Sequence, residues 1–153
     1  MAAKEILKWN FVDPERIAVW GWSGGGSTTL NLMFQYPEIF KTGISVAPVT
    51  NLLTYDNVYQ ERYMGLPQDN MANYIKGSPI THAKNLQGNL LLIHGTGDDN
   101  VHYQNAVEMS AALVKANKQF TQMAYPNKNH GIYGGNTRYH LYKKMTDFIL
   151  ENL

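Results

Sequence analysis

The stretch from Ile17 to Tyr36 constrains the fold more than any other part of the chain. Its first residues, Ile17 to Trp20, form a β-branched and aromatic run that predicts a buried strand. The run stops at Gly21-Trp22-Ser23-Gly24-Gly25, and the residues that follow place apolar side chains on one helix face, namely Leu30, Met33 and Phe34. A strand that enters an amphipathic helix through a tight glycine-rich turn predicts a sheet with that helix packed against it.

The turn itself has the pattern Gly-x-Ser-x-Gly, which in this context predicts a nucleophile elbow with Ser23 at its tip. The flanking glycines, Gly21 and Gly25, are expected because side chains there would collide with the neighbouring strand and helix. The start of the helix would aim backbone N–H groups, that of Gly24 among them, at developing negative charge. A flexible glycine-rich linker is the alternative, but a linker is not expected between a buried strand and a packed helix.

Composition excludes several classes of protein. With 153 residues, of which 44% are hydrophobic, the chain is long enough for one compact domain. A net charge of +1 with 16% charged residues indicates neither a nucleic-acid partner nor a membrane surface. The absence of cysteine excludes disulfides, zinc–thiolate sites and a cysteine nucleophile. No apolar run approaches the roughly 20 residues that span a bilayer, and the first residues lack the apolar core of a signal peptide.

The remaining patterns predict an α/β fold with about four parallel strands and helices on both faces of the sheet. Ile6 and Leu7 are expected to face inward from the first helix, and Val114 from the helix after the third strand, together with Ala106, Met109 and Leu113. The expected strands are 17–20, 43–46, 89–94 and 120–125, and the expected helices are 2–9, 24–36, 57–64, 70–75, 102–116 and 139–150.

Three kinds of side chain follow the strands where chemistry is expected in a parallel sheet, at the carboxyl ends. Ser23 follows the first strand, Asp98 and Asp99 the third, and His130 the fourth. Ser, then Asp, then His is the chain order of the α/β-hydrolase triad. A serine hydroxyl needs an imidazole to take its proton, and a carboxylate to orient that imidazole. Spacing alone does not distinguish Asp98 from Asp99, since one could orient the histidine while the other caps the next helix.

The other candidate sites are weaker. His94 lies at the end of a buried strand and is expected to be a hydrogen-bonded core residue, whereas His102 and His140 are expected at the surface. The spacing of residues 98–102 fits neither a calcium loop nor a zinc pattern, so no metal is expected. Residues 21–27 lack the lysine of a phosphate-binding loop, and the dinucleotide pattern Gly-x-Gly-x-x-Gly is absent. No cofactor is therefore expected.

Three motifs, residues 21–23, 94–102 and 130–131, resemble the prolyl oligopeptidase family of serine peptidases. Residues 55–67 are similar to its dipeptidyl peptidase IV branch almost throughout. The resemblance implies Ser23 as nucleophile, Asp98 as triad acid and His130 as base, with the Gly24 N–H in the oxyanion hole. It also implies substrate-binding residues: Val49, Tyr55, Tyr59 and Val101 around the P1 proline, and Asn100 on the P2 carbonyl. The family usually has tyrosine where this chain has Gly24, which predicts a looser P1 pocket.

The resemblance implies a peptide substrate and release of X-Pro or X-Ala dipeptides from peptide N termini. An acylaminoacyl-peptidase, an oligopeptidase, an esterase or a non-catalytic interaction module of the same fold are the alternatives. Residues 1–153 are expected to be the C-terminal portion of the catalytic domain, without the family's N-terminal strands and β-propeller. An open edge at the first strand would favour self-association, so a homo-oligomer is expected. A secreted, periplasmic or outer-surface location follows from the resemblance alone.

Overall fold

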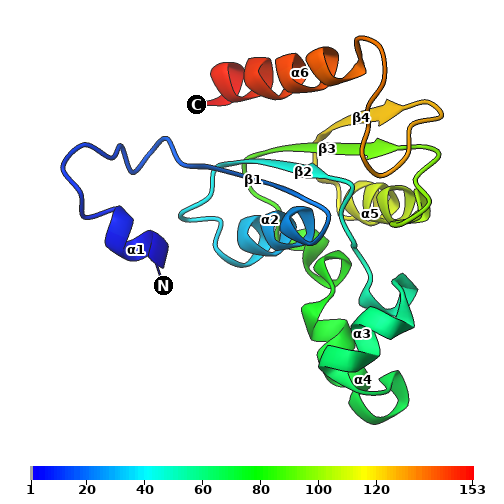
Figure 1. The fold of residues 1–153 in the computed structure, drawn as a ribbon. Coiled ribbons are helices and arrows are strands. Elements are labelled where there is room, and N and C mark those ends of the chain that lie inside the picture. The colour runs from blue at the N-terminus through cyan, green and yellow to red at the C-terminus, as the bar shows by residue number, and fades with distance from the viewer. Residues whose placement is uncertain (1) are drawn as a thin grey trace.

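The computed structural model describes residues 2–153, and its centre is a single parallel sheet (Figure 1). The four strands lie in the order of the chain, β1-β2-β3-β4, and each pairs in parallel with its neighbours. Their bounds are β1 Ala18–Trp22, β2 Thr42–Val46, β3 Asn89–Gly95 and β4 Thr121–Tyr125. The predicted partial α/β fold is confirmed, and the carboxyl ends of all four strands meet at one edge of the sheet.

Helices cover both faces of the sheet, as expected (Figure 1). The connections α2 (Gly24–Gln35) and α5 (Gln104–Lys115) pack on one face, and α6 (Thr137–Asn152) packs on the other. Strand β3 shows why both faces need cover, because its side chains alternate between the two apolar clusters. Leu90 and Leu92 belong to the cluster with α2 and α5, whereas Leu91 and Ile93 belong to the cluster with α6.

The connection between β2 and β3 contains most of the short helices. Its elements are η1 Leu52–Thr54, α3 Asn57–Met64, α4 Pro67–Gly77 and η2 Pro79–Asn85. The Asp56 carboxylate caps α3 by accepting the Val58 N–H at 3.1 Å, and Pro67 begins α4 with its fixed φ. Helix α3 has the predicted bounds, whereas α4 is longer than predicted at both ends and is kinked at Asn70. Together α3 and α4 project from the sheet (Figure 1).

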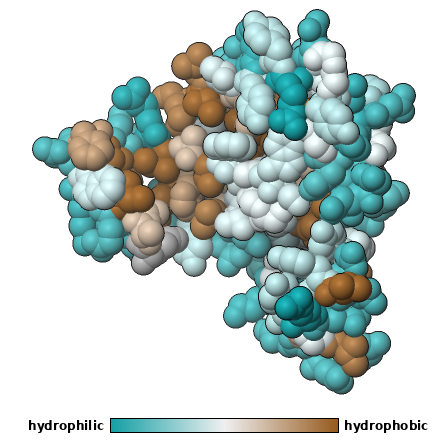
Figure 2. All heavy atoms as spheres, in the orientation of Figure 1, coloured by the Kyte–Doolittle hydropathy of each residue, from teal (hydrophilic) through white to brown (hydrophobic). Residues whose placement is uncertain are grey.

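Two expectations about the N-terminal part of the chain are wrong. The first helix, α1, covers only Ala2–Ile6 and lies beyond the β1 edge of the sheet, and Ile6 is 41% exposed, whereas Leu7 is partly buried and packs against the cluster with α2 and α5, as expected. Strand β1 was expected to be buried, but Trp20 on it is 53% exposed. The reason is that β1 is the edge strand of the described sheet. Figure 2 shows apolar atoms at the surface between this edge and the segment that carries α1.

The helix after β3 also differs from its prediction. Ala106, Met109 and Leu113 are fully buried, as expected, but Val114 is 68% exposed. Residues 106, 109 and 113 recur at the helical spacing and point to the sheet, whereas residue 114 is turned about a quarter of a turn away from Leu113. Val114 was therefore expected on the buried face of this helix only because its side chain is apolar, and that expectation is wrong.

Candidate active site

Ser23 occupies a strained turn between β1 and α2. Its φ of 57° and ψ of −121° lie outside the regions that a non-glycine residue usually adopts. The Ser23 N–H donates to the carbonyl oxygen of Val46 at 2.8 Å, which ties the turn to the end of β2. Helix α2 begins at the next residue, Gly24. The elbow predicted by the sequence is therefore present, with its strain at the serine.

Only one of the two flanking glycines has the steric role that was expected. A Cβ on Gly21 would lie 2.2 Å from the carbonyl oxygen of Gly25, so no side chain fits there. A Cβ on Gly25 would meet no atom within 4 Å, and the expectation for that residue is wrong. The second close approach is at Gly26, where a Cβ would lie 2.8 Å from the Val46 carbonyl oxygen. The backbone of Gly25 itself occupies the space beside Gly21, which is why the two sites differ.

The first turn of α2 provides hydrogen-bond donors beside Ser23. The first N–H groups of a helix have no intrahelical acceptor, and the helix dipole adds a partial positive charge at this end. Gly24 is exposed and has no side chain to cover its N–H. The backbone of Gly24 is therefore in a position to stabilise an oxyanion formed at Ser23.

His130 and Asp98 are hydrogen-bonded to each other. Nδ1 of His130 lies 2.8 Å from Oδ2 of Asp98, whose side chain is completely buried, while the His130 side chain is 23% exposed. The other carboxylate oxygen, Oδ1, accepts the N–H groups of Asn100 at 3.0 Å and Val101 at 2.9 Å. Because the Asp98 carboxylate accepts a hydrogen bond from Nδ1, the proton of His130 stays on Nδ1 and Nε2 is left as the acceptor nitrogen.

Asp99, the alternative left open by spacing, is exposed at the surface. Neither aspartate caps α5, because that helix begins at Gln104 and its N-cap residue, Tyr103, makes no side-chain cap. The Gln104 N–H instead donates to Nδ1 of His102 at 3.3 Å. The structure therefore brings Asp98, and not Asp99, to His130.

Trp22 connects the two halves of the candidate triad, a contact that sequence reasoning missed. Its indole Nε1–H donates to the backbone carbonyl oxygen of His130 at 3.0 Å, across 108 residues of sequence. Within residues 2–153, the side chains of Ser23 and His130 make no direct hydrogen bond with each other. Hydrogen bonds of catalytic groups are often long until substrate is bound. No local pattern marks Trp22 for this role, because its partner lies on a distant loop.

A cavity of about 330 Å³ opens beside Ser23. Val49, Tyr55 and Tyr59 line it together with Ser23 and Gly24. The rings of Tyr55 and Tyr59 meet edge to face, with centroids 5.7 Å apart. The cavity is also lined by Ser27, Thr28, Asn31, Leu52, Gln60 and Gly77. Of these, Ser27 and Asn31 could have been found from sequence, since they follow Ser23 at steps of four along the helix.

Val101 and Asn100 lie elsewhere. Val101 has no exposed surface and does not line the cavity; its backbone N–H instead donates to Asp98. Asn100 is exposed, and its Oδ1 accepts the hydroxyl proton of Tyr55 at 2.9 Å. Burial, followed by the nearby Asp56 carboxylate, raises the pKa of the Tyr55 hydroxyl, so this group remains a neutral donor. The amide nitrogen of Asn100 is thereby left to donate to another acceptor.

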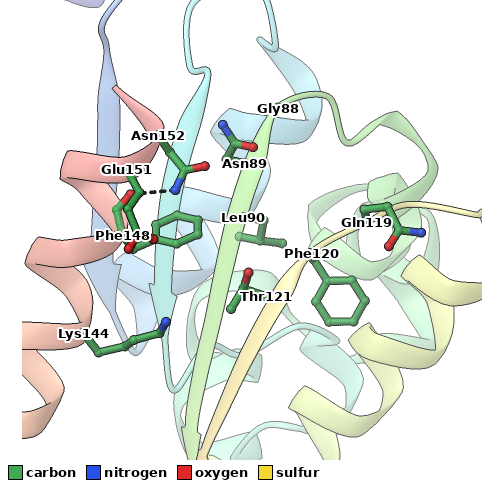
Figure 3. A pocket seen from close by; sticks show the side chains of 10 residues that line it. All are labelled: Gly88, Asn89, Leu90, Gln119, Phe120, Thr121, Lys144, Phe148, Glu151 and Asn152. Carbon is green, nitrogen blue, oxygen red and sulfur yellow. Dashed lines mark hydrogen bonds between the residues drawn. The ribbon is translucent and has the colours of Figure 1, made fainter.

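A second cavity, of about 350 Å³, lies at the opposite end of the sheet (Figure 3). It is found where β3 and β4 begin, beside the last turns of α6, and Lys144 and Glu151 contribute charged groups to its wall. None of the predicted site residues lies there. Within residues 2–153, no cluster of three metal-ligating side chains is present, and none of the helices is long and apolar enough to cross a bilayer.

Comparisons with known proteins find close relatives. The model of the prolyl oligopeptidase family matches residues 1–153. Dipeptidyl peptidase 4 of Felis catus is 47% identical over 98% of this chain, and prolyl endopeptidase FAP of Mus musculus is 42% identical over the same share. The crystal structure of Porphyromonas gingivalis dipeptidyl peptidase 4 superposes over 99% of this chain with a TM-score of 0.97 and 49% identity. The chain spans 20% of the two curated relatives and 22% of the crystallised chain.

Proposed function

Because the chain belongs to the prolyl oligopeptidase family of serine peptidases, we propose that its site is that of a serine exopeptidase which releases X-Pro or X-Ala dipeptides from peptide N termini. The family resemblance seen in the sequence is confirmed by the comparisons. In this proposal residues 1–153 are the C-terminal portion of an α/β-hydrolase catalytic domain. The observation that carries the proposal is the hydrogen bond of 2.8 Å between His130 and the buried Asp98, at the same sheet edge as Ser23.

The first half of the reaction acylates Ser23. His130 Nε2 takes the hydroxyl proton of Ser23 as Oγ attacks the carbonyl carbon of the second substrate residue. Asp98 holds the proton on Nδ1 of His130 and stabilises the imidazolium that forms. The Gly24 N–H stabilises the oxyanion. His130 then returns the proton to the leaving amine, so that the peptide bond breaks and the dipeptide remains as an ester on Ser23.

The second half releases the dipeptide. Water takes the place of the leaving amine, and His130 removes its proton as the oxygen attacks the ester carbonyl. Collapse of the intermediate returns the proton to Oγ of Ser23 and frees the dipeptide carboxylate. The net change is hydrolysis of one peptide bond, and no cofactor takes part.

The cavity beside Ser23 supports selection of a small flat side chain. A proline ring is an apolar disc, and the walls formed by Tyr55, Tyr59 and Val49 offer it contact area. Because Gly24 contributes no ring to this wall, we expect alanine to be accepted beside proline. Asn100 would donate its amide N–H to the carbonyl of the first substrate residue, with Tyr55 holding its oxygen.

A fluorophosphonate tests the serine-hydrolase part of the proposal. It should add once to the chain, as seen by intact mass, and the adduct should be absent from Ser23→Ala. Asp98→Asn should label at least about 10²-fold more slowly, whereas the matched variant Asp99→Asn should label like the wild type. Equal rates for the two asparagine variants would contradict the role of Asp98. A reactive chain that keeps its adduct in Ser23→Ala would contradict the choice of nucleophile.

The substrate class is tested on the full-length protein. Hydrolysis of Gly-Pro-anilide but not of acetyl-Ala-anilide is expected for a dipeptidyl peptidase, because only that activity requires a free amino terminus. The reverse preference would favour an acylaminoacyl-peptidase. A full-length protein that reacts with neither anilide nor with the fluorophosphonate would be a non-catalytic module.

A further inference from the structure

His94 is a second imidazole against the Asp98 carboxylate. It lies near the end of β3, and its side chain has no exposed surface. Nε2 of His94 lies 2.8 Å from the carbonyl oxygen of Val101 and 3.2 Å from Oδ2 of Asp98. Oδ2 is the same oxygen that accepts Nδ1–H of His130. The mechanism above does not use His94.

The partners of His94 determine which of its nitrogens carries the proton. A carbonyl oxygen only accepts, so Nε2 must be protonated and donates to Val101, while Oδ2 of Asp98 lies 3.2 Å from the same nitrogen. Nδ1 is buried and has no partner in residues 2–153. The ring of Tyr103 meets His94 edge to face at 5.7 Å, and the titratable groups that face it are Asp98 and His130. Burial lowers the pKa of His94, in agreement with a neutral ring.

A plain packing role does not explain this residue. Position 94 continues the row formed by Leu90 and Leu92 on one face of β3, where an apolar side chain would fit the surroundings. A histidine there leaves Nδ1 without a hydrogen bond, which is unusual for a buried polar atom and unfavourable. The Nε2–H that histidine adds to this row is hydrogen-bonded to the Val101 carbonyl oxygen, and its nitrogen lies 3.2 Å from Oδ2 of Asp98.

We propose that His94 is a positioning residue: its Nε2–H group is fixed by the Val101 carbonyl, and the partial positive charge that it presents 3.2 Å from Oδ2 keeps this oxygen of Asp98 in line with His130. The proposal deepens the proposed function and rests on it for its catalytic meaning. Asp98 Oδ1 is held by two backbone N–H groups, whereas within residues 2–153 Oδ2 accepts a hydrogen bond only from His130, a partly exposed side chain on a loop. His94 adds a polar N–H group beside Oδ2 from the rigid end of β3.

Two substitutions separate donation from packing. His94→Phe keeps a ring of similar size but has no N–H, whereas the amide nitrogen of His94→Gln can reach the place of Nε2. We expect His94→Phe to lower the rate of fluorophosphonate labelling of Ser23 about tenfold, and His94→Gln to restore most of it. Leu92→Ala, on the same face of β3 but away from the carboxylate, controls for general loss of stability. It should melt earlier and still label.

Nuclear magnetic resonance supplies a readout that does not depend on reactivity. In the wild-type chain, the ¹⁵N chemical shifts of the His94 ring should show that Nε2 is protonated and Nδ1 is not. The hydrogen-bonded Nδ1–H proton of His130 should be sharp in the wild type and in His94→Gln, and broadened or displaced in His94→Phe. If these signals were observed but neither the wild type nor any variant reacted with the fluorophosphonate, the proposed function would be refuted and the positioning role of His94 would stand.

Two results would overturn the proposal. One is a nitrogen shift which shows that His94 carries its proton on Nδ1 in the wild-type chain. This measurement needs no variant, so it does not depend on how His94→Phe folds. The other is a folded His94→Phe that labels at the wild-type rate with an unchanged His130 proton signal.

Discussion

Replacing Gly21 with alanine should disable the site, whereas the same replacement at Gly25 should not. In Gly21→Ala the new Cβ would lie 2.2 Å from the carbonyl oxygen of Gly25, while ordinary contacts begin at 3.4 Å. The atoms must therefore separate by about 1 Å, and the obstacle is backbone, which no side-chain rotation can relieve. Overpacking of this kind costs about 1–3 kcal/mol of stability.

The labelling rate should fall even where the Gly21→Ala protein still folds. The backbone that must move is the first turn of α2, which carries the Gly24 N–H and adjoins Ser23. A displacement of about 1 Å at a reacting group costs about 10²-fold in rate. Gly25→Ala meets no atom within 4 Å and lies within a helix, so its stability should rise by up to about 1 kcal/mol with labelling near the wild-type rate.

The assay is the rate of fluorophosphonate labelling followed by intact mass, with urea unfolding of the same samples for stability. Both variants are glycine to alanine in one elbow, so each controls for the other. A Gly21→Ala protein that is folded and labels at the wild-type rate would refute the steric reasoning. An equal loss in Gly25→Ala would refute it as well, because the argument depends on the free space at that position.

Three further predictions concern the contacts around the site. Trp22→Phe removes the indole N–H that the His130 carbonyl accepts, so labelling should slow about tenfold, and an unchanged rate would show that the bond does not position the loop. Burial lowers the pKa of His94 below 6.5, so below that pH the unfolded chain binds a proton that the folded chain does not. The free energy of unfolding measured in urea should therefore fall as the pH drops below about 6.5, and it should fall less in His94→Gln. An equal dependence of this free energy on pH in the two proteins would contradict the prediction. The exposed edge of β1 should cause concentration-dependent self-association in light scattering, reduced by Trp20→Lys, and a monodisperse wild-type monomer would refute it.

Prediction of the fold from sequence succeeded where the pattern was periodic and buried. Leu30, Met33 and Phe34 on α2 are at most 1% exposed, as the helical spacing indicated. It was wrong for Ile6, Trp20 and Val114, whose apolar side chains are exposed. The exposure of Ile6 and Trp20 depends on whether another part of the protein packs beside α1 and β1, and the local pattern of residues contains no information on that.

The positions of the candidate residues after strands could be predicted from the sequence, whereas their roles stay a prediction. Ser23, the aspartate pair and His130 were all selected by their positions at strand ends. The choice of Asp98 over Asp99 came from resemblance, and the physical reason lies in the turn after β3. There Oδ1 of Asp98 binds the N–H groups two and three residues on, which turns Oδ2 toward His130.

The sequence by itself therefore determined the parallel sheet, the elbow and the chain order of the candidate triad. These depend on local periodicity, on turn residues and on the rule that strand ends meet at one edge of a sheet. Only the tertiary structure decided which contacts hold the site together: Trp22 with His130, His94 with Asp98, and Gly21 with Gly25. The first joins residues far apart in sequence, and all three depend on directions of atoms in space, which residue types and spacings do not specify.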